Sequence, residues 1–164
     1  VSDGRITPVQ WKNLPDGEVF TAPESVNGTI IIDGCLGDFF TEKYGSIEKT
    51  PVKIQVIDGR AIKESITCDN KKLLAEFVKY LFEIDENSNR IGEFAIGTNT
   101  GLTKLIYNLL QDEKFPGIHV AFGNPYPTKT GAKWESKAHV DGVLIKPSIY
   151  VDGEMIMNKG TFVL

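Results

Sequence analysis

The segment 138–145, AHVDGVLI, constrains this chain most because it places two polar side chains inside an otherwise apolar strand. Apolar and β-branched residues dominate it and a Pro-Ser pair follows, a pattern typical of a buried strand. Side chains alternate faces along a strand, so His139 and Asp141 point the same way, about 6–7 Å apart along the chain. Such a pair is either a satisfied structural hydrogen bond or part of a functional site.

The other histidine of the chain favours a functional site. His119 lies in residues 117–123 (GIHVAFG), a second short apolar segment, and the 164 residues contain 2 histidines in all. We therefore interpret the two histidines as placed and not scattered, and we expect them to converge with Glu93 and Asp141 from separate apolar strands.

The remaining pattern predicts an α+β fold in which strands outnumber helices. Apolar runs bounded by Gly, Pro and Asp-Gly turns predict further strands over 18–23, 28–34, 52–57, 60–65, 90–97, 148–151, 154–157 and 161–164. In the residues before the first of these strands, Trp11 is the one large apolar anchor.

Apolar residues at helical spacing predict two main helices. The first covers 70–83, with Asp69 as its N-cap, and the second covers 102–113. The inward-facing residues of the second are Leu102, Ile106, Leu109 and Leu110. We expect one domain over 1–164, built as a mixed, curved, strand-rich sheet with these two helices packed on it.

Composition excludes several functional classes. The net charge is −4, from 18 basic and 22 acidic side chains, and no basic run or stripe appears, so we expect neither nucleic acid nor an anionic membrane as a partner. No apolar run reaches the ~20 residues of a membrane span, and no secretory signal pattern is seen in these 164 residues. A reduced, cytoplasmic state is expected for Cys35 and Cys68, with a disulfide as the alternative.

Two glutamates complete a candidate metal site. Glu93 is flanked by Ile91, Phe94 and Ile96, where an unpaired carboxylate is costly to bury. Glu18 directly follows a Pro-Asp-Gly turn, a pattern that by itself favours a solvated carboxylate. With the strand residues these make three carboxylates and two imidazoles, a ligand mix suited to zinc, cobalt, manganese or ferrous iron. The set is Glu18, Glu93, His119, His139 and Asp141.

Four motifs in order carry a resemblance to a known family. They are 13–23 (NLPDGEVFTAP), 91–99 (IGEFAIGTN), 112–127 (DEK, then GIHVAFGNPYP) and 138–142 (AHVDG). This pattern resembles the metal-binding half of the thermophilic aminopeptidases of the aminopeptidase T and S type. The resemblance implies the five residues above as metal ligands, with Glu93 bridging two ions, Tyr126 at or beside the metal, and zinc or cobalt as the ions.

Two departures from the family concern substrate handling. The family's N-terminal α/β domain is absent before the first motif, so the chain is expected to be a domain fragment or a natural short relative. The segment between Tyr126 and His139 is also shorter than the family's. A domain without its usual partner domain exposes apolar surface, and we expect it to associate as a homodimer.

The chemistry that the resemblance implies is aminopeptidase action on a peptide N-terminus. Two divalent ions activate a water molecule and polarise the scissile carbonyl. Glu113 is a candidate general base, against a solvated carboxylate at a helix end, and Tyr126 a candidate oxyanion donor, against a packed loop tyrosine.

Two other functions stay open at this stage. His119, His139 and Asp141 alone have the composition of a facial triad for one ferrous iron, as in a dioxygenase that cleaves hydroxypyridine-type rings. The third interpretation is an inactive metal-binding domain fragment. Metal content separates the three: two ions, one iron, or none.

Overall fold

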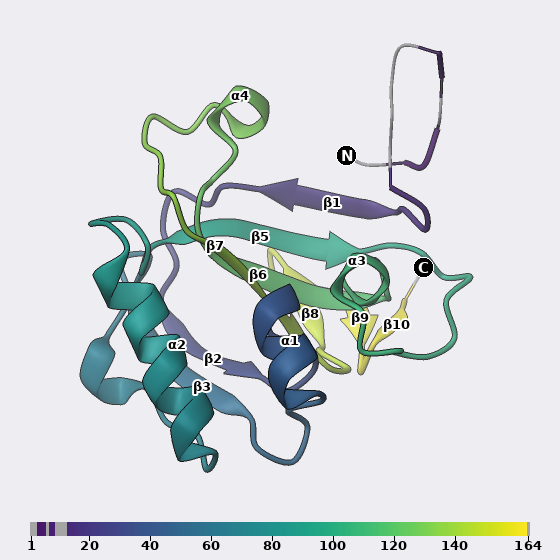
Figure 1. Ribbon diagram of the computed structural model, residues 1–164. Helices are drawn as coiled ribbons and strands as arrows, with labels where there is room; N and C mark the ends of the chain where they lie inside the picture. Colours follow the sequence, from purple (N-terminus) through teal and green to yellow (C-terminus); the bar gives the residue numbers. More distant parts are fainter. Residues whose placement is uncertain (1–2, 6, 9–12, 164) are drawn as a thin grey trace.

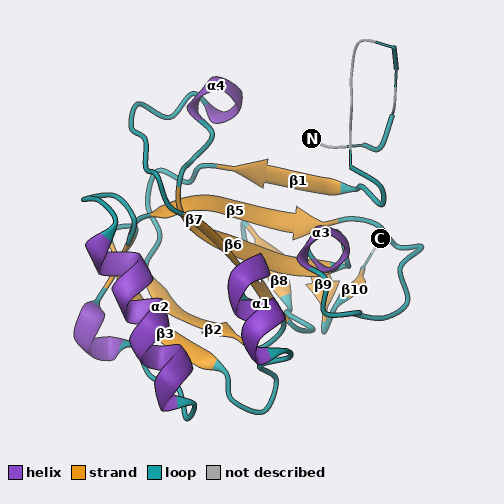
Figure 2. Ribbon diagram, viewed as in Figure 1, coloured by secondary structure: helices purple, strands orange, loops and turns teal. Residues whose placement is uncertain are grey.

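The computed structural model describes residues 3–5, 7–8 and 13–163, and the predicted anchor Trp11 lies outside them. Within this part of the chain the α+β class is confirmed (Figures 1 and 2). The strands form three separate sheets instead of the single mixed sheet expected. Each of the three is antiparallel and not mixed, because every ladder joins strands that run in opposite directions.

The four-stranded sheet is the scaffold of the molecule. Its order is β1 (Glu18–Thr21), β5 (Ile91–Gly97), β6 (Gly117–Gly123) and β7 (His139–Leu144). The two histidine-bearing segments, β6 and β7, are therefore neighbouring strands, and β5, which carries Glu93, pairs with β6 on its other side (Figure 1).

Two smaller sheets flank this scaffold. One contains β2 (Gly28–Ile32), β3 (Val52–Ile57) and β4 (Arg60–Ala61), and the other β8 (Ile149–Val151), β9 (Glu154–Asn158) and β10 (Thr161–Phe162). The predicted Asp58-Gly59 hairpin is present. Its second strand was predicted to reach residue 65 but stops at Ala61, because the chain turns there into the short 3-10 helix Lys63–Ser65.

The first predicted helix is confirmed as α2, Lys71–Glu83. Its cap is Asn70 and not Asp69, since the Asn70 side chain accepts a hydrogen bond from the backbone N–H of Leu73 at 3.1 Å. Leu73, Phe77 and Leu81 are its buried stripe. A helix that the sequence did not predict, α1 (Asp38–Tyr44), is short and lies between Gly37 and Gly45; its Phe40 ring packs on the ring of Phe77.

The predicted helix over 102–113 is wrong except for its last turn, α3 (Leu109–Asp112). Asp112 explains the difference, because its buried carboxylate accepts the backbone N–H groups of Ile106 and Tyr107 at 2.9 and 2.8 Å and folds residues before α3 into a loop. Tyr107 has a φ of 58°, which a helix does not allow. Ile106 and Leu110, expected to face inward, are 48% and 49% exposed.

One further short helix, α4 (Pro127–Thr130), follows β6. Both cysteines are buried and neither forms a disulfide; the Cys35 thiol donates to Asp112 at 3.1 Å. Among the helices of the described part, none has the length and apolar character needed to cross a bilayer.

Candidate metal centre

The register of the four-stranded sheet places all five predicted ligand residues on one face. Residues paired across a sheet share a face, and so do residues two apart in one strand. Ala121 pairs with both Glu93 and Asp141, and His119, two residues before it, is on the same side. By the same rule His139, two residues before Asp141, lies on this face as well. Glu18 also lies on it, because Glu18 pairs with Gly97, and Gly97 is on the same face of β5 as Glu93.

Small residues make room for these side chains. On the face in question, the other positions of β5 and β6 are alanine or glycine: Ala95, Gly97, Gly117, Ala121 and Gly123. Long polar side chains alternating with residues that have almost none create a recess above a flat floor, and the opposite face is left for the apolar core.

A β-bulge directs Glu93 into this recess. The pairing of β5 with β6 shifts between Ile91 and Glu93, so that Gly92 is an extra residue. Ile91 can therefore pack in the core while Glu93, two residues later, points to the other side. A Cβ at position 92 would overlap the Gly123 carbonyl oxygen, so the bulge requires glycine here.

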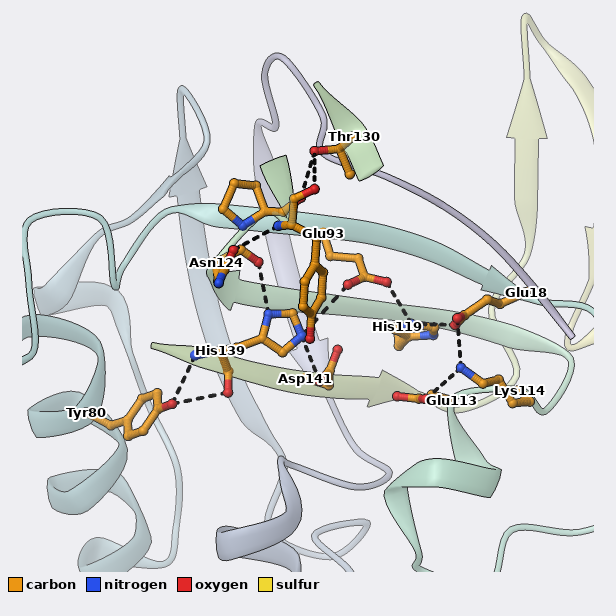
Figure 3. A network of polar contacts seen from close by, with 12 residues as sticks. Glu18, Tyr80, Glu93, Glu113, Lys114, His119, Asn124, Thr130, His139 and Asp141 are labelled. Atoms are coloured by element: carbon orange, nitrogen blue, oxygen red, sulfur yellow. Dashed lines mark hydrogen bonds and ion pairs between the residues drawn. The ribbon is translucent and has the colours of Figure 1, made fainter. Parts of the chain in front are cut away.

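Glu93 stands between the two histidines. Its Oε1 lies 3.5 Å from Nε2 of His119 and its Oε2 lies 3.8 Å from Nε2 of His139 (Figure 3). Asp141 lies 3.3 Å from Nε2 of His139, and Glu18 lies 3.5 Å from Nε2 of His119. Each imidazole thus faces one oxygen of Glu93 and one further carboxylate.

Three of these four separations fit zinc coordination, and the 3.8 Å contact of Glu93 with His139 is slightly longer. Zinc bonds of about 2.0–2.2 Å in a tetrahedral shell place neighbouring ligand atoms about 3.3–3.6 Å apart. A direct charge-assisted hydrogen bond would instead be about 2.7–2.9 Å. Two of the triplets whose ligand atoms all lie within 4.8 Å share Glu93: one is Glu18, Glu93 and His119, the other Glu93, His139 and Asp141. The residues present therefore fit a divalent metal at this cluster.

His139 is oriented for such a role. Its Nδ1 lies 3.0 Å from the backbone carbonyl oxygen of Asn124, and since a carbonyl only accepts, Nδ1 donates and Nε2 is turned toward the carboxylates. Burial alone would lower the pKa of His139, but the hydrogen bond and charge of Asp141 raise it to about 9. The ring of Tyr126 lies 4.7 Å from the His139 ring, so Tyr126 borders the cluster.

The backbone of His139 is held from α2. β7 is an edge strand, and residues 34–37 complete its outer side between Asp141 and Val143. At His139 this role passes to the Tyr80 hydroxyl, which accepts the His139 N–H and donates to the His139 carbonyl, both at 3.1 Å (Figure 3). Nothing in the sequence marked Tyr80, which has the helical spacing of an ordinary α2 residue.

Tyr80→Phe should lower the affinity for a metal ion beside His139 by about tenfold, because a ligand that loses an orienting partner binds metal more weakly. The ion beside His119 should change little. Tyr44→Phe is the matched control, because it removes a hydroxyl that bonds Glu76. Calorimetric metal titration of the three proteins measures both ions. An equal loss at both positions would show that Tyr80 supports only the fold.

Glu113 is not the solvated helix-end carboxylate that the pattern favoured. Its side chain is 14% exposed, and its carboxylate forms a third close group with His119 and Asp141. Burial raises the pKa of Glu113 to about 7, against the opposing effect of the Lys114 ammonium. Glu18 is likewise buried, and its Oε1 pairs with Lys114 at 2.8 Å.

A cavity of about 420 Å³ opens over the cluster. Its walls add aromatic and apolar groups to the polar floor, and the wall residues include Phe20, Phe39, Tyr80, Leu109, Leu110 and Tyr126. The carboxylates of the floor outnumber its cations, so the cavity attracts cationic groups.

Buried carboxylates and imidazoles with these spacings, under an open cavity, define the class of divalent metal enzymes. The chain belongs to the thermophilic metalloprotease family (M29), whose sequence model matches residues 7–161. Membership implies a divalent metal, in agreement with the donor set.

Among solved structures, the chain is similar to 2,5-dihydroxypyridine dioxygenase from Pseudomonas putida KT2440. The TM-score is 0.64 at 20% identity, over 88% of this chain and 42% of that one. The chain thus spans less than half of that protein, and the likeness concerns the fold alone. No curated protein matches.

Proposed function

We propose that this domain carries the metal centre of an aminopeptidase that uses two divalent ions, zinc or cobalt, to hydrolyse N-terminal peptide bonds. The observation that carries the proposal is the position of Glu93, with one oxygen toward each histidine and a further carboxylate beside each. Manganese and iron also bind carboxylates and imidazoles and are the alternative ions. Self-association as a homodimer remains a prediction.

The chain's own groups supply the proton transfers. When bound, divalent ions of this kind supply a nucleophilic water at neutral pH and polarise the scissile carbonyl. Glu113 takes the proton of that water, since a carboxylate with a pKa of about 7 can hold it and then release it to the leaving amine. The Tyr126 hydroxyl, with its pKa raised to about 12 chiefly by burial, stays protonated and can donate to the developing oxyanion.

The acidic floor favours an N-terminal substrate. A free peptide amine is cationic or neutral and suits a recess lined by carboxylates, whereas an internal peptide segment brings no such group. The deciding assay compares an aminoacyl p-nitroanilide with its N-acetylated counterpart, using protein loaded with Co²⁺ or Zn²⁺. Cleavage of the first only, with two ions per chain, supports the proposal.

The mononuclear alternative is less well supported by geometry. Among the described residues, three groups have ligand atoms within 4.8 Å of one another, and His119 and His139 never occur in the same group. A facial triad of His119, His139 and Asp141 needs all three on one ion. One iron per chain with oxygen consumption would favour the dioxygenase, and protein without metal or activity would favour an inactive fragment.

Glu113→Gln should lower kcat by about 10²–10⁴-fold while metal content stays at two ions, because it removes a proton acceptor and not a ligand. Glu83→Gln on the surface of α2 is the control and should leave kcat unchanged. Steady-state kinetics and elemental analysis of the same preparations measure both quantities. A loss of metal in parallel with kcat would make Glu113 a ligand and not a base.

A further inference from the structure

Lys114 is a buried cation inside the cluster that the proposed reaction does not use. Its side chain is 4% exposed and its ammonium lies 2.8 Å from Glu18 and 2.6 Å from Glu113 (Figure 3). A lysine is rarely so deeply buried unless it is paired, and here both partners are carboxylates of the site.

The backbone fixes where this charge stands. Lys114 directly follows α3 and its cap Glu113. Its backbone N–H donates to the backbone carbonyl of Gln111 at 2.9 Å, and its carbonyl accepts from the backbone N–H of Asn99, just after β5, at 3.0 Å. The ammonium is therefore held at the β1 end of the cluster and cannot swing into solvent without breaking two buried ion pairs.

The charge is placed unequally with respect to the two candidate ion positions. Glu18 gives Oε1 to Lys114 and turns Oε2 toward His119, so a single carboxylate separates the ammonium from the position beside His119. Among the described residues, the ion-pair partners of Lys114 are Glu18 and Glu113, and neither belongs to the group of Glu93, His139 and Asp141.

We propose that Lys114 is a built-in cation that makes the two ion positions unequal, so that the position beside His139 fills first and the position beside His119 fills only at higher metal concentration. The proposal rests on the two-ion site proposed above. A fixed positive charge near a divalent ion repels it, and it also shares the Glu18 carboxylate that the ion needs. A unit charge and a divalent ion about 5 Å apart repel by roughly a tenfold factor in affinity even at the dielectric of water.

This inequality has a consequence for the enzyme. Intermediate metal concentrations would yield a chain with one ion, held by Glu93, His139 and Asp141, and with Lys114 as the neighbouring cation in place of the second metal. Lys114 is thus a residue that sets the metal requirement of the reaction and is not itself a reacting group.

The test is titration of Co²⁺ into metal-free protein, followed by calorimetry and by the visible spectrum of bound cobalt. Four proteins are compared: wild type, Lys114→Met, Lys114→Arg and Lys43→Met. The Met variant removes the charge at similar length, and the Arg variant keeps the charge. Lys43→Met is the matched control, because Lys43 pairs with Glu76 outside the cluster at 2.7 Å. Circular dichroism checks that each variant is folded.

In Lys114→Met the weaker cobalt ion should bind at least tenfold more tightly, with the tighter ion within about threefold of wild type. Lys114→Arg and Lys43→Met should keep the wild-type gap. A wild type that takes one ion, beside a Met variant that takes two, supports the proposal in its strongest form. The proposal is overturned if the Met variant binds both ions equally better, no better or worse, or if a folded Arg variant closes the gap. Two unequal ions without peptidase activity would refute the proposed function and leave this inference standing.

Discussion

Glu93→Gln should lower the affinity for each of the two ions by about a hundredfold or more and abolish peptidase activity. Changes in residues that only support a ligand already cost 10–100-fold in metal affinity, and Glu93 offers an oxygen to each position. Glutamine keeps the volume of the side chain, so the apo-protein should still fold. Cobalt titration by calorimetry, with elemental analysis after dialysis, measures the loss at each position.

The matched comparison is Glu18→Gln. Glu18 faces His119 and Lys114 but belongs to no group with His139, so this variant should lose the ion beside His119 and retain the other. If Glu93 is only a buried structural carboxylate, Glu93→Gln will change the melting temperature and not the metal content. Loss of one ion in each variant would remove the bridge and much of the case for a two-ion hydrolase.

The part of the site that was predictable from sequence is the part that strand alternation determines. His139 and Asp141 share a face because they are two residues apart, and the sheet then needs only antiparallel neighbours to bring His119 beside them. Glu93 met the expectation that a buried carboxylate finds partners, although its direction depends on the bulge at Gly92, which a simple alternation does not include.

The contacts that the sequence left out come from other elements of the chain. Tyr80 on α2 and Lys114 after α3 have no distinctive local pattern, because their roles depend on where these helices dock on the sheet. Glu18 illustrates the same limit, since a carboxylate after a tight turn is usually solvated, but here it is buried beside Lys114 and His119, which come from other elements. Residues 102–108 had helical spacing, but the hydrogen bonds of Asp112 overrode it.

Metal affinity should rise steeply with pH, by about tenfold per unit between pH 6 and 8, and level off above pH 9. In the metal-free protein Asp141 raises the pKa of His139 to about 9 despite burial, and Glu93 raises that of His119. The His139 imidazole is then largely protonated near neutral pH, and an ion must displace this proton to bind. Glu113, with a pKa of about 7, titrates in the same range, but its proton is not one that the ion displaces.

The stability of the metal-free protein should change with pH in the direction opposite to metal affinity. A raised pKa in the folded state stabilises the fold below the unfolded pKa of about 6.5, and this contribution is lost as pH rises through about 9. The apo melting temperature should therefore fall between pH 6.5 and 9 while the added stabilisation by Zn²⁺ grows. Calorimetry in two buffers of different ionisation enthalpy counts the protons released, and at pH 7 we expect about one proton per chain from His139. Proton release near zero at pH 7 would mean that the His139 imidazole is neutral before the metal arrives, and that Asp141 does not hold it in the charged form.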